Sequence, residues 1–275
     1  MGRSPSARLG RGPFSVNDIS PGDRYELSLG HPIYCAPGGG DHAKASSVGA
    51  LVIDTDPDVE STGVDAGYAL SETTMRAPDI SVGVPDEPGW VRGVPPLAIE
   101  YAGRGQDEAE LKTKIREFLA AGTRWVWVVR LTMPRCVEVH EKQKKVRRLH
   151  PGQLLEAPGI LRNPVRVEAL FDRRIAMESA LQNLLQQKGY ASLDEVREQG
   201  LEQGLEQGLE QGLEQGLERG KLEAILAVLR SRGIALSKRS TAKILAERDP
   251  DRIHRWLERV ATVTSTTELL REGRK

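Results

Sequence analysis

A strand–helix–strand pattern over residues 97–129 constrains the fold of this chain more than any other feature. Two apolar runs, Leu97–Tyr101 and Arg124–Val129, flank a segment whose apolar residues share one helical face. Those residues are Leu111, Ile115, Phe118 and Leu119. Asp107 is placed to cap the start of this helix and Gly122 to end it. Because such crossovers are right-handed, we expect parallel strands with the helix over one face of an α/β sheet.

Two acids and a lysine occupy the ends of these elements. Asp79 opens a β-like run, Pro78–Val84, and Glu100 lies near the end of the run Leu97–Tyr101. Lys114 lies on the helix, about 85° from the centre of its apolar stripe, so its ammonium group can reach a strand end. Paired carboxylates can hold a hard cation, and a nearby lysine can stabilise an attacking hydroxide or a charged phosphorane. The pattern therefore favours metal-dependent phosphodiester chemistry.

These motifs belong to a longer series. Its other members are Tyr25-Glu26-Leu27, Gly30, Pro37-Gly38-Gly39, His42, Trp127-Val128-Val129, Cys136-Val137-Glu138-Val139 and Leu170-Phe171. With Pro78-Asp79 and Glu100, the series resembles the Uma-type branch of the PD-(D/E)XK nuclease superfamily, a branch of restriction endonucleases. The match covers roughly residues 23–171.

The resemblance implies a restriction-endonuclease-like mixed sheet flanked by helices. It further implies a divalent-metal-dependent DNA endonuclease in which Asp79, Glu100 and Lys114 are catalytic, with Glu26 and His42 as further candidates. Mg²⁺, or Mn²⁺, would be held by Asp79, Glu100 and a backbone carbonyl near Tyr101, with waters completing an octahedron. DNA would then be the partner.

The chain departs from the superfamily pattern at the lysine. The superfamily name predicts a lysine two residues after the second acid, but Ala102 stands there. The lysine role therefore falls to Lys114 or Lys112. Glu110 stands where relatives usually carry Asp.

Each candidate also has a purely structural interpretation. Glu26 either orients the lysine or a metal-bound water, or is an exposed strand residue. His42 either positions a phosphate or water, or lies in a surface loop. Lys114 can pair with Glu110 four residues earlier, and Glu110 can complete a capping box. Glu100 can form a structural salt bridge, for which the candidate partners are Arg76, Arg104 and Lys114.

Composition limits the partners. The chain has 39 basic and 39 acidic residues, so attraction to nucleic acid has to come from local patches such as Lys142–Arg148, which we expect at the tip of a hairpin. Cys35 and Cys136 are far apart in the sequence, which fits a reducing compartment. No run of about 18 apolar residues is present, so we expect no membrane span and a cytoplasmic protein.

Four segments are expected along the chain. They are a flexible tail (1–20), a nuclease-like domain (21–175), a helical spacer (176–222) and a small helical bundle (223–275). Residues 25–53 are expected to form short strands between Gly and Pro turns, and residues 85–96 to form the loop that joins the two acid-bearing strands. The spacer repeats Leu-Glu-Gln-Gly, with a glycine at every fourth position costing about 1 kcal/mol each relative to alanine. We expect this helix to form with help from a partner or a neighbouring helix, and a coiled coil or homo-oligomer through the C-terminal helices is open. Beyond it, residues 222–232 and 240–270 are expected to form two or three short amphipathic helices. One apolar face would contain Leu222, Ile225, Leu226 and Leu229, and its complement Ile244, Leu245, Ile253, Trp256, Leu257 and Val260.

The sequence thus predicts a metal-dependent DNA endonuclease. The alternative is a non-catalytic scaffold that keeps the nuclease fold and assembles partners through its helical C-terminal region. A nucleic-acid binder without cleavage is a third interpretation.

Overall fold

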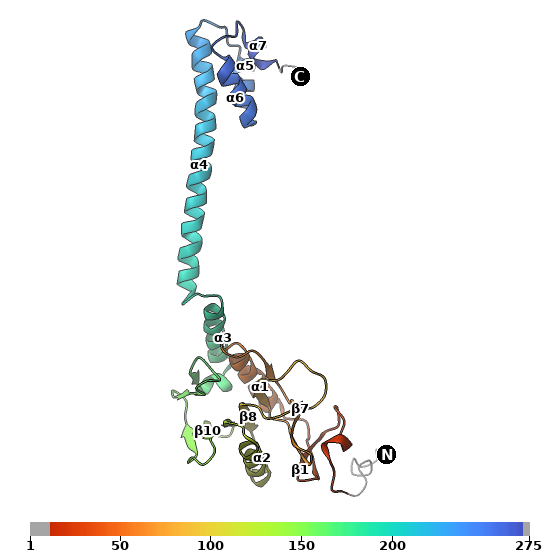
Figure 1. The fold of residues 1–275 in the computed structure, drawn as a ribbon. Helices are drawn as coiled ribbons and strands as arrows, with labels where there is room; N and C mark the ends of the chain where they lie inside the picture. The colour runs from red at the N-terminus through yellow and green to blue at the C-terminus, as the bar shows by residue number, and fades with distance from the viewer. Residues whose placement is uncertain (1–11, 272–275) are drawn as a thin grey trace. The chain divides into compact units, whose positions relative to one another are not determined.

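The computed structural model describes residues 12–271 (Figure 1). The chain divides into two compact units, one up to Leu193 and the other from Asp194. The four-segment division expected from the sequence stays a prediction. Its tail falls partly outside the described residues, at positions 1–11. From position 12 onward the expected flexibility is wrong, because Val16 and Ile19 are buried against the first strands.

A six-stranded mixed sheet forms the centre of the first unit, in the order β11-β10-β9-β8-β6-β3. Its strands are β3 (Thr62–Gly63), β6 (Ile80–Val82), β8 (Leu97–Ala102), β9 (Trp125–Arg130), β10 (Cys136–His140) and β11 (Arg147–Leu149). As predicted, β8 and β9 run parallel, with Glu100 opposite Val128, whereas the other pairs are antiparallel.

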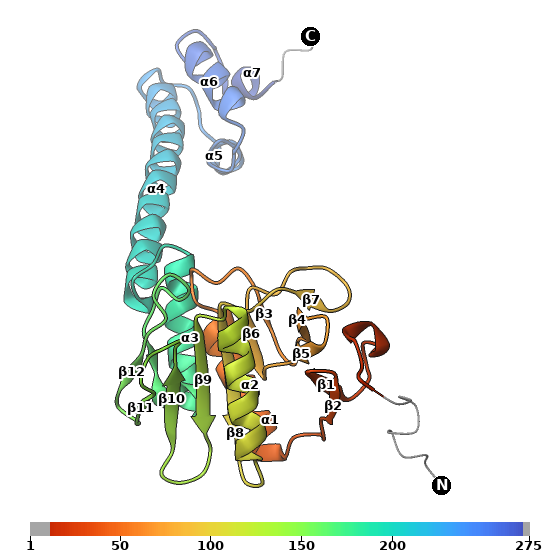
Figure 2. The ribbon, with the colours of Figure 1, turned by 60° about the horizontal axis from the view of Figure 1, so that its bottom comes forward.

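Helices cover both faces of this sheet. The helix α2 (Glu108–Ala121) lies over β8 and β9 (Figure 2). Its buried face of Leu111, Ile115 and Phe118 packs on these strands. The helix begins at the predicted cap Asp107 and ends at Gly122. The opposite face packs against α1 (Gly40–Asp54), the 3-10 helix η3 (Val167–Leu170) and α3 (Arg173–Gln187). Because side chains alternate along a strand, every residue of β8 is buried on one face or the other.

The segment that includes α1 was expected to form short strands, and this is wrong for residues 40–54. Ala45, Gly49, Val52 and Ile53 are buried at helical spacing, four, three and one residues apart. Small residues at two of these positions let the helix approach the sheet closely. The glycine-rich lead-in Pro37–Gly39 hides this periodicity in the sequence.

A second sheet carries residues that reach the candidate site. Its order is β2-β1-β5-β4-β7. The strands are β1 (Tyr25–Ser28), β2 (His31–Tyr34), β4 (Tyr68–Ser71), β5 (Thr74–Arg76) and β7 (Val91–Arg92). The 3-10 helix η2 (Val16–Asp18) leads into it. The short β7 lies within the segment 85–96 that was expected to be loop throughout.

The basic stretch Lys142–Arg148 lies at the predicted hairpin of β10 and β11, with Arg147 and Arg148 in β11 itself. Acids neutralise part of it, because Arg148 pairs with Glu138 at 2.9 Å and Lys144 pairs with Glu141 at 2.5 Å. A separate two-stranded sheet of β12 (Leu154–Leu155) and β13 (Val165–Arg166) follows the hairpin.

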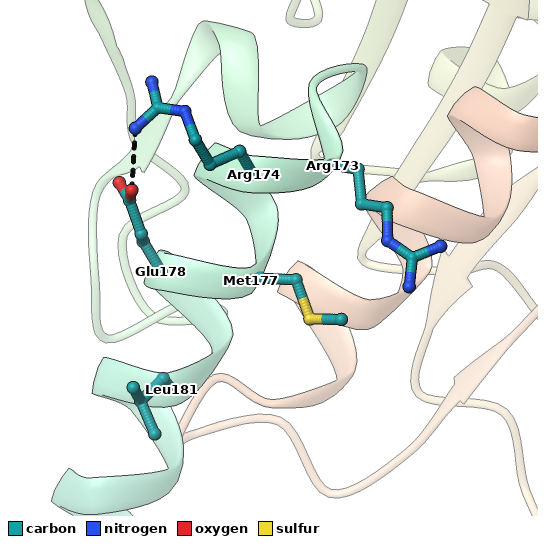
Figure 3. Close-up of a pocket in the computed structure, with 5 residues that line it drawn as sticks. All are labelled: Arg173, Arg174, Met177, Glu178 and Leu181. Carbon is teal, nitrogen blue, oxygen red and sulfur yellow. Dashed lines mark hydrogen bonds and ion pairs between the residues drawn. The ribbon is translucent and has the colours of Figure 1, made fainter.

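The outer face of α3 is partly apolar. Met177, Leu181 and Leu184 are 48%, 44% and 45% exposed. A shallow pocket on this helix is lined by Arg173, Arg174, Met177, Glu178 and Leu181 (Figure 3). All of its lining residues come from α3, and none is a predicted site residue.

The second unit contains α4 (Leu193–Ser231), α5 (Lys238–Leu245), α6 (Pro250–Arg259) and α7 (Thr266–Leu270). The predicted face of Leu222, Ile225, Leu226 and Leu229 packs in one buried cluster with Ile244, Ile253, Trp256 and Val260. Leu245 was expected in this cluster but is 40% exposed. The expected separate helix Leu222–Arg232 is wrong, because α4 continues from the repeat without a break.

Within α4 the repeat leucines at 201, 205, 209, 213 and 217 are 63–74% exposed. The repeat glycines have no other group within 4 Å of a Cβ added to them. Across residues 12–271, no helix combines the length and apolarity that a membrane crossing requires.

Candidate active site

Asp79 and Glu100 meet on adjacent antiparallel strands. The register pairs Ile80 of β6 with Ile99 of β8, so the preceding Asp79 lies opposite Glu100. The backbone N–H of Tyr101 donates a hydrogen bond of 2.6 Å to Oδ2 of Asp79. This bond holds one carboxylate oxygen of Asp79 at the edge of β8.

Glu100 is buried on the face of β8 that α2 covers. Burial raises the pKa of Glu100, Lys114 opposes this effect, and the charges of Asp79 and Glu26 add to it, so that the pKa is about 8. Its Oε1 lies 2.8 Å from Lys114 Nζ and forms an ion pair with it. A buried carboxylate that lies opposite a second acid is a candidate ligand for a cation.

Lys114 points from α2 into the same cluster. Its Nζ lies 2.9 Å from Glu26 Oε1 and donates a hydrogen bond of 2.7 Å to the carbonyl oxygen of Ala77. Burial lowers the pKa of Lys114, but the charges of Glu100, Glu26 and Asp79 outweigh it and raise the pKa above its ordinary value. The lysine is therefore held as a cation. Lys112, the alternative candidate, is exposed on the same helix.

Glu26 is a buried residue of β1, so its interpretation as an exposed strand residue is wrong. One oxygen faces Lys114, and the other accepts a hydrogen bond of 2.9 Å from Arg76 Nη1. Burial raises the pKa of Glu26, but the two cations together outweigh burial and leave the pKa below its ordinary value. Glu26 thus carries a charge that is shared between Lys114 and Arg76.

His42 lies in the first turn of α1, not in a surface loop as one interpretation held. Its Nε2 is 3.1 Å from Asp79 Oδ1, and this hydrogen bond raises the pKa of the imidazole. The ring also meets the ring of Tyr101 edge to face, with 6.1 Å between centroids. His42 therefore fixes the oxygen of Asp79 that Tyr101 does not hold.

The side chain of Tyr101 anchors the end of β8. Its hydroxyl donates a hydrogen bond of 2.9 Å to the carbonyl oxygen of Leu170. The ring is buried against Gly49 of α1, where a Cβ would lie 1.9 Å from the hydroxyl oxygen. The backbone carbonyl of Tyr101 as a metal ligand stays a prediction.

Sequence reasoning missed the organising role of Arg76, which is fully buried at the end of β5. Its guanidinium binds Glu26, Glu110 at 2.6 Å, and Glu117. Glu110 therefore neither completes the capping box nor pairs with Lys114. The signal in the sequence was the arginine three residues before Asp79, which was considered only as a partner of Glu100.

Asp65 was also missed. Burial raises the pKa of Asp65, and the negative charge of Asp79 adds to this effect. The two carboxylates therefore interact electrostatically. Asp65 has a φ of +53°, which is rare for a non-glycine residue. In the sequence it belongs to a Val-Asp-Ala-Gly stretch that resembles an ordinary turn.

The donor atoms present suit a hard cation. Within residues 12–271, no group of three or more histidine, cysteine or acidic side chains is arranged to hold a metal ion. A cation here would therefore rest on the carboxylates of Asp79 and Glu100, backbone oxygen and water. Mg²⁺ sites commonly have this composition, since the ion keeps several waters. The buried carboxylate of Glu100 fits such a role, because carboxylate oxygens are ligands of Mg²⁺.

Two comparisons relate the chain to known proteins. The model of a family described as "Uma2: Putative restriction endonuclease" matches residues 15–167, more than half of the 275 residues. The crystal structure of "a putative nuclease belonging to DUF820" from Anabaena variabilis is similar in fold, with a TM-score of 0.51 and 19% identity. The similarity covers 58% of this chain and 99% of that one. No curated protein matches the chain.

Proposed function

We propose a function from one premise: this chain belongs to the family described as "Uma2: Putative restriction endonuclease". The sequence led to the same family, and the mixed α/β architecture agrees with it. On this premise, the protein is a divalent-metal-dependent DNA endonuclease that hydrolyses phosphodiester bonds.

The observation that supports this proposal is the meeting of three groups from separate elements. Asp79 lies opposite Glu100, and Lys114 lies 2.8 Å from Glu100. Burying this much charge costs free energy, and a core could be built more stably from apolar residues. A buried acid beside a second acid and a lysine is what a site for metal-assisted hydrolysis requires.

Each residue then has a role in phosphodiester hydrolysis. Asp79 and Glu100 would hold a divalent cation, which would supply Lewis acidity and make water a stronger acid. The Lys114 ammonium group stabilises the negative charge that develops on the phosphoryl oxygens. His42 and the Tyr101 N–H orient the two oxygens of Asp79. Glu26 also holds Lys114, because its Oε1 lies 2.9 Å from the same Nζ that pairs with Glu100.

The test is nicking of supercoiled DNA in Mg²⁺ or Mn²⁺. We expect Asp79→Asn and Glu100→Gln each to lower the rate by at least about a hundredfold, with an unchanged circular dichroism spectrum. Lys114→Met should also lower the rate strongly, whereas the matched variant Lys112→Met, on the exposed part of α2, should not. Cleavage that survives both acid substitutions would refute the assignment.

The second candidate is a non-catalytic scaffold of the same fold, favoured by the row of exposed leucines on α4. Calorimetry separates the two candidates, because a scaffold need not bind Mg²⁺ through Asp79 and Glu100. DNA retention that weakens with salt but persists in Asp79→Asn, without cleavage by the wild type, would instead indicate a nucleic-acid binder.

A further inference from the structure

Arg76 binds two acids of α2, the helix that carries Lys114. Glu110 and Glu117 of α2 both bind its guanidinium, the first at Nη1 and the second at Nε. They lie four residues before and three residues after Lys114, so all three side chains lie on the same side of the helix. Arg76 therefore fixes the turn of α2 on either side of the lysine.

Arg76 also holds the residue against which Lys114 rests. Nη1 donates a hydrogen bond of 2.9 Å to Oε2 of Glu26, while Oε1 of Glu26 faces the lysine at 2.9 Å. The neighbouring Ala77 adds two contacts, because its N–H donates to Oε1 of Glu26 and its carbonyl accepts from Lys114. Arg76 thus holds Glu26 through its guanidinium and holds Ala77 through the peptide bond between them.

The charge of Arg76 affects where the Lys114 ammonium group lies. Glu26 is buried, so it needs compensating positive charge nearby. With Arg76 present, it is compensated from two sides. Without the arginine, Lys114 alone would compensate it and would be drawn away from Glu100.

We propose that Arg76 is a positioning residue that keeps the Lys114 ammonium group beside Glu100, acting through Glu26 and through α2. The expected effect on kcat rests on the proposed nuclease function. The effect on the position of Lys114 does not depend on that function. Within residues 12–271, the side-chain partners of Arg76 are Glu26, Glu110 and Glu117 and include neither Asp79 nor Glu100, so it acts through other residues.

Arg76→Lys is the direct test, because it keeps the charge but cannot span the sites that Nη1 and Nε occupy. Arg130→Lys is the matched control. Arg130 also binds an acid of α2, Glu108 at 2.6 Å, and a sheet acid, Glu138 at 3.0 Å, but it touches neither Glu26 nor Lys114. Glu117→Gln, which loosens the grip from a partly exposed position, is the second variant if Arg76→Lys does not fold.

Crystal structures of the metal-free variants give the first readout. We expect Lys114 Nζ to leave Glu100 in Arg76→Lys, or in Glu117→Gln, and to stay within ion-pair distance in Arg130→Lys. A lysine that stays in place in every variant would overturn the proposal. This readout holds even if the wild-type protein proves to have no nuclease activity.

DNA-nicking kinetics give the second readout. A misplaced lysine should lower kcat by about tenfold or more while leaving KM within about twofold. Arg130→Lys should change neither. Equal losses of kcat in Arg76→Lys and Arg130→Lys would reduce Arg76 to a general structural role and overturn its positioning role.

Discussion

Replacement of Gly49 by alanine tests how tightly α1 holds the end of β8. The new Cβ would lie 1.9 Å from the hydroxyl oxygen of Tyr101 and 3.3 Å from Cδ1 of Ile80. Normal contact requires the hydroxyl and the methyl group to separate by about 1.5 Å more. The hydroxyl cannot move this far and keep its hydrogen bond of 2.9 Å to the Leu170 carbonyl.

The expected cost follows from three contributions. Overpacking of a buried site costs about 1–3 kcal/mol. A lost buried hydrogen bond costs about another 1–3 kcal/mol. Alanine regains about 1 kcal/mol of helix propensity over glycine. Gly49→Ala should therefore lower the free energy of unfolding by about 3 kcal/mol, with a range of about 1–5 kcal/mol.

Urea unfolding followed by tryptophan fluorescence measures this loss in the first unit, which holds Trp90, Trp125 and Trp127 of the four tryptophans. Gly40→Ala is the control on the same helix, because its added Cβ meets nothing within 4 Å, and it should change stability by less than about 0.5 kcal/mol.

A double-mutant cycle isolates the clash. In a Tyr101→Phe background the hydroxyl oxygen is gone, so Gly49→Ala should cost about 2 kcal/mol less than it does in the wild type. Equal costs in both backgrounds, or a Gly49→Ala variant as stable as Gly40→Ala, would refute the reasoning.

Three further predictions concern stability. Because the folded-state pKa of Glu26 lies below its ordinary value of 4.5, its stabilising charge is present above that pH and lost as pH falls below it. Glu26→Gln should make the acid side of the stability profile shallower, as measured by unfolding across pH; an unchanged slope contradicts this. The buried carboxylate of Asp56 accepts hydrogen bonds from three backbone N–H groups, so Asp56→Ala should cost about 2–5 kcal/mol in urea unfolding, and a loss under about 1 kcal/mol counts against it. Gly208→Ala and Gly212→Ala should each stabilise α4 by about 1 kcal/mol, seen as more helical circular dichroism on heating, and no gain would indicate that the glycines are contacted in solution.

Local pattern was enough to place the lysine beside the second acid. The spacing of apolar residues predicted α2 and its ends, and the handedness of crossovers predicted the parallel pair β8 and β9. The position of Lys114 at the margin of the apolar stripe predicted its reach toward Glu100, which the structure has at 2.8 Å. These inferences depend on residues close together in the sequence, where few arrangements compete.

Ion pairs between residues that are distant in the sequence could not be predicted from local pattern. Arg76 has three acidic partners that lie 34 to 50 residues away, and an arginine at the end of a strand gives no sign of which acids it will meet. The small residues of α1 were a second difficulty, because their burial depends on close approach to the sheet. Helical periodicity made of Ala and Gly is weak in the sequence although its packing is tight.

The position of Glu26 determines where the shortest fragment that keeps the candidate site must begin. A fragment beginning at Thr74 would contain Asp79, Glu100 and Lys114, yet it would lack β1 and the carboxylate that Arg76 and Lys114 share. The Arg76 guanidinium would then lose its partner Glu26, and β5 would lose its neighbouring strand β1. Any minimal fragment that keeps the candidate site intact should therefore begin before Tyr25, well ahead of Asp79 and Glu100.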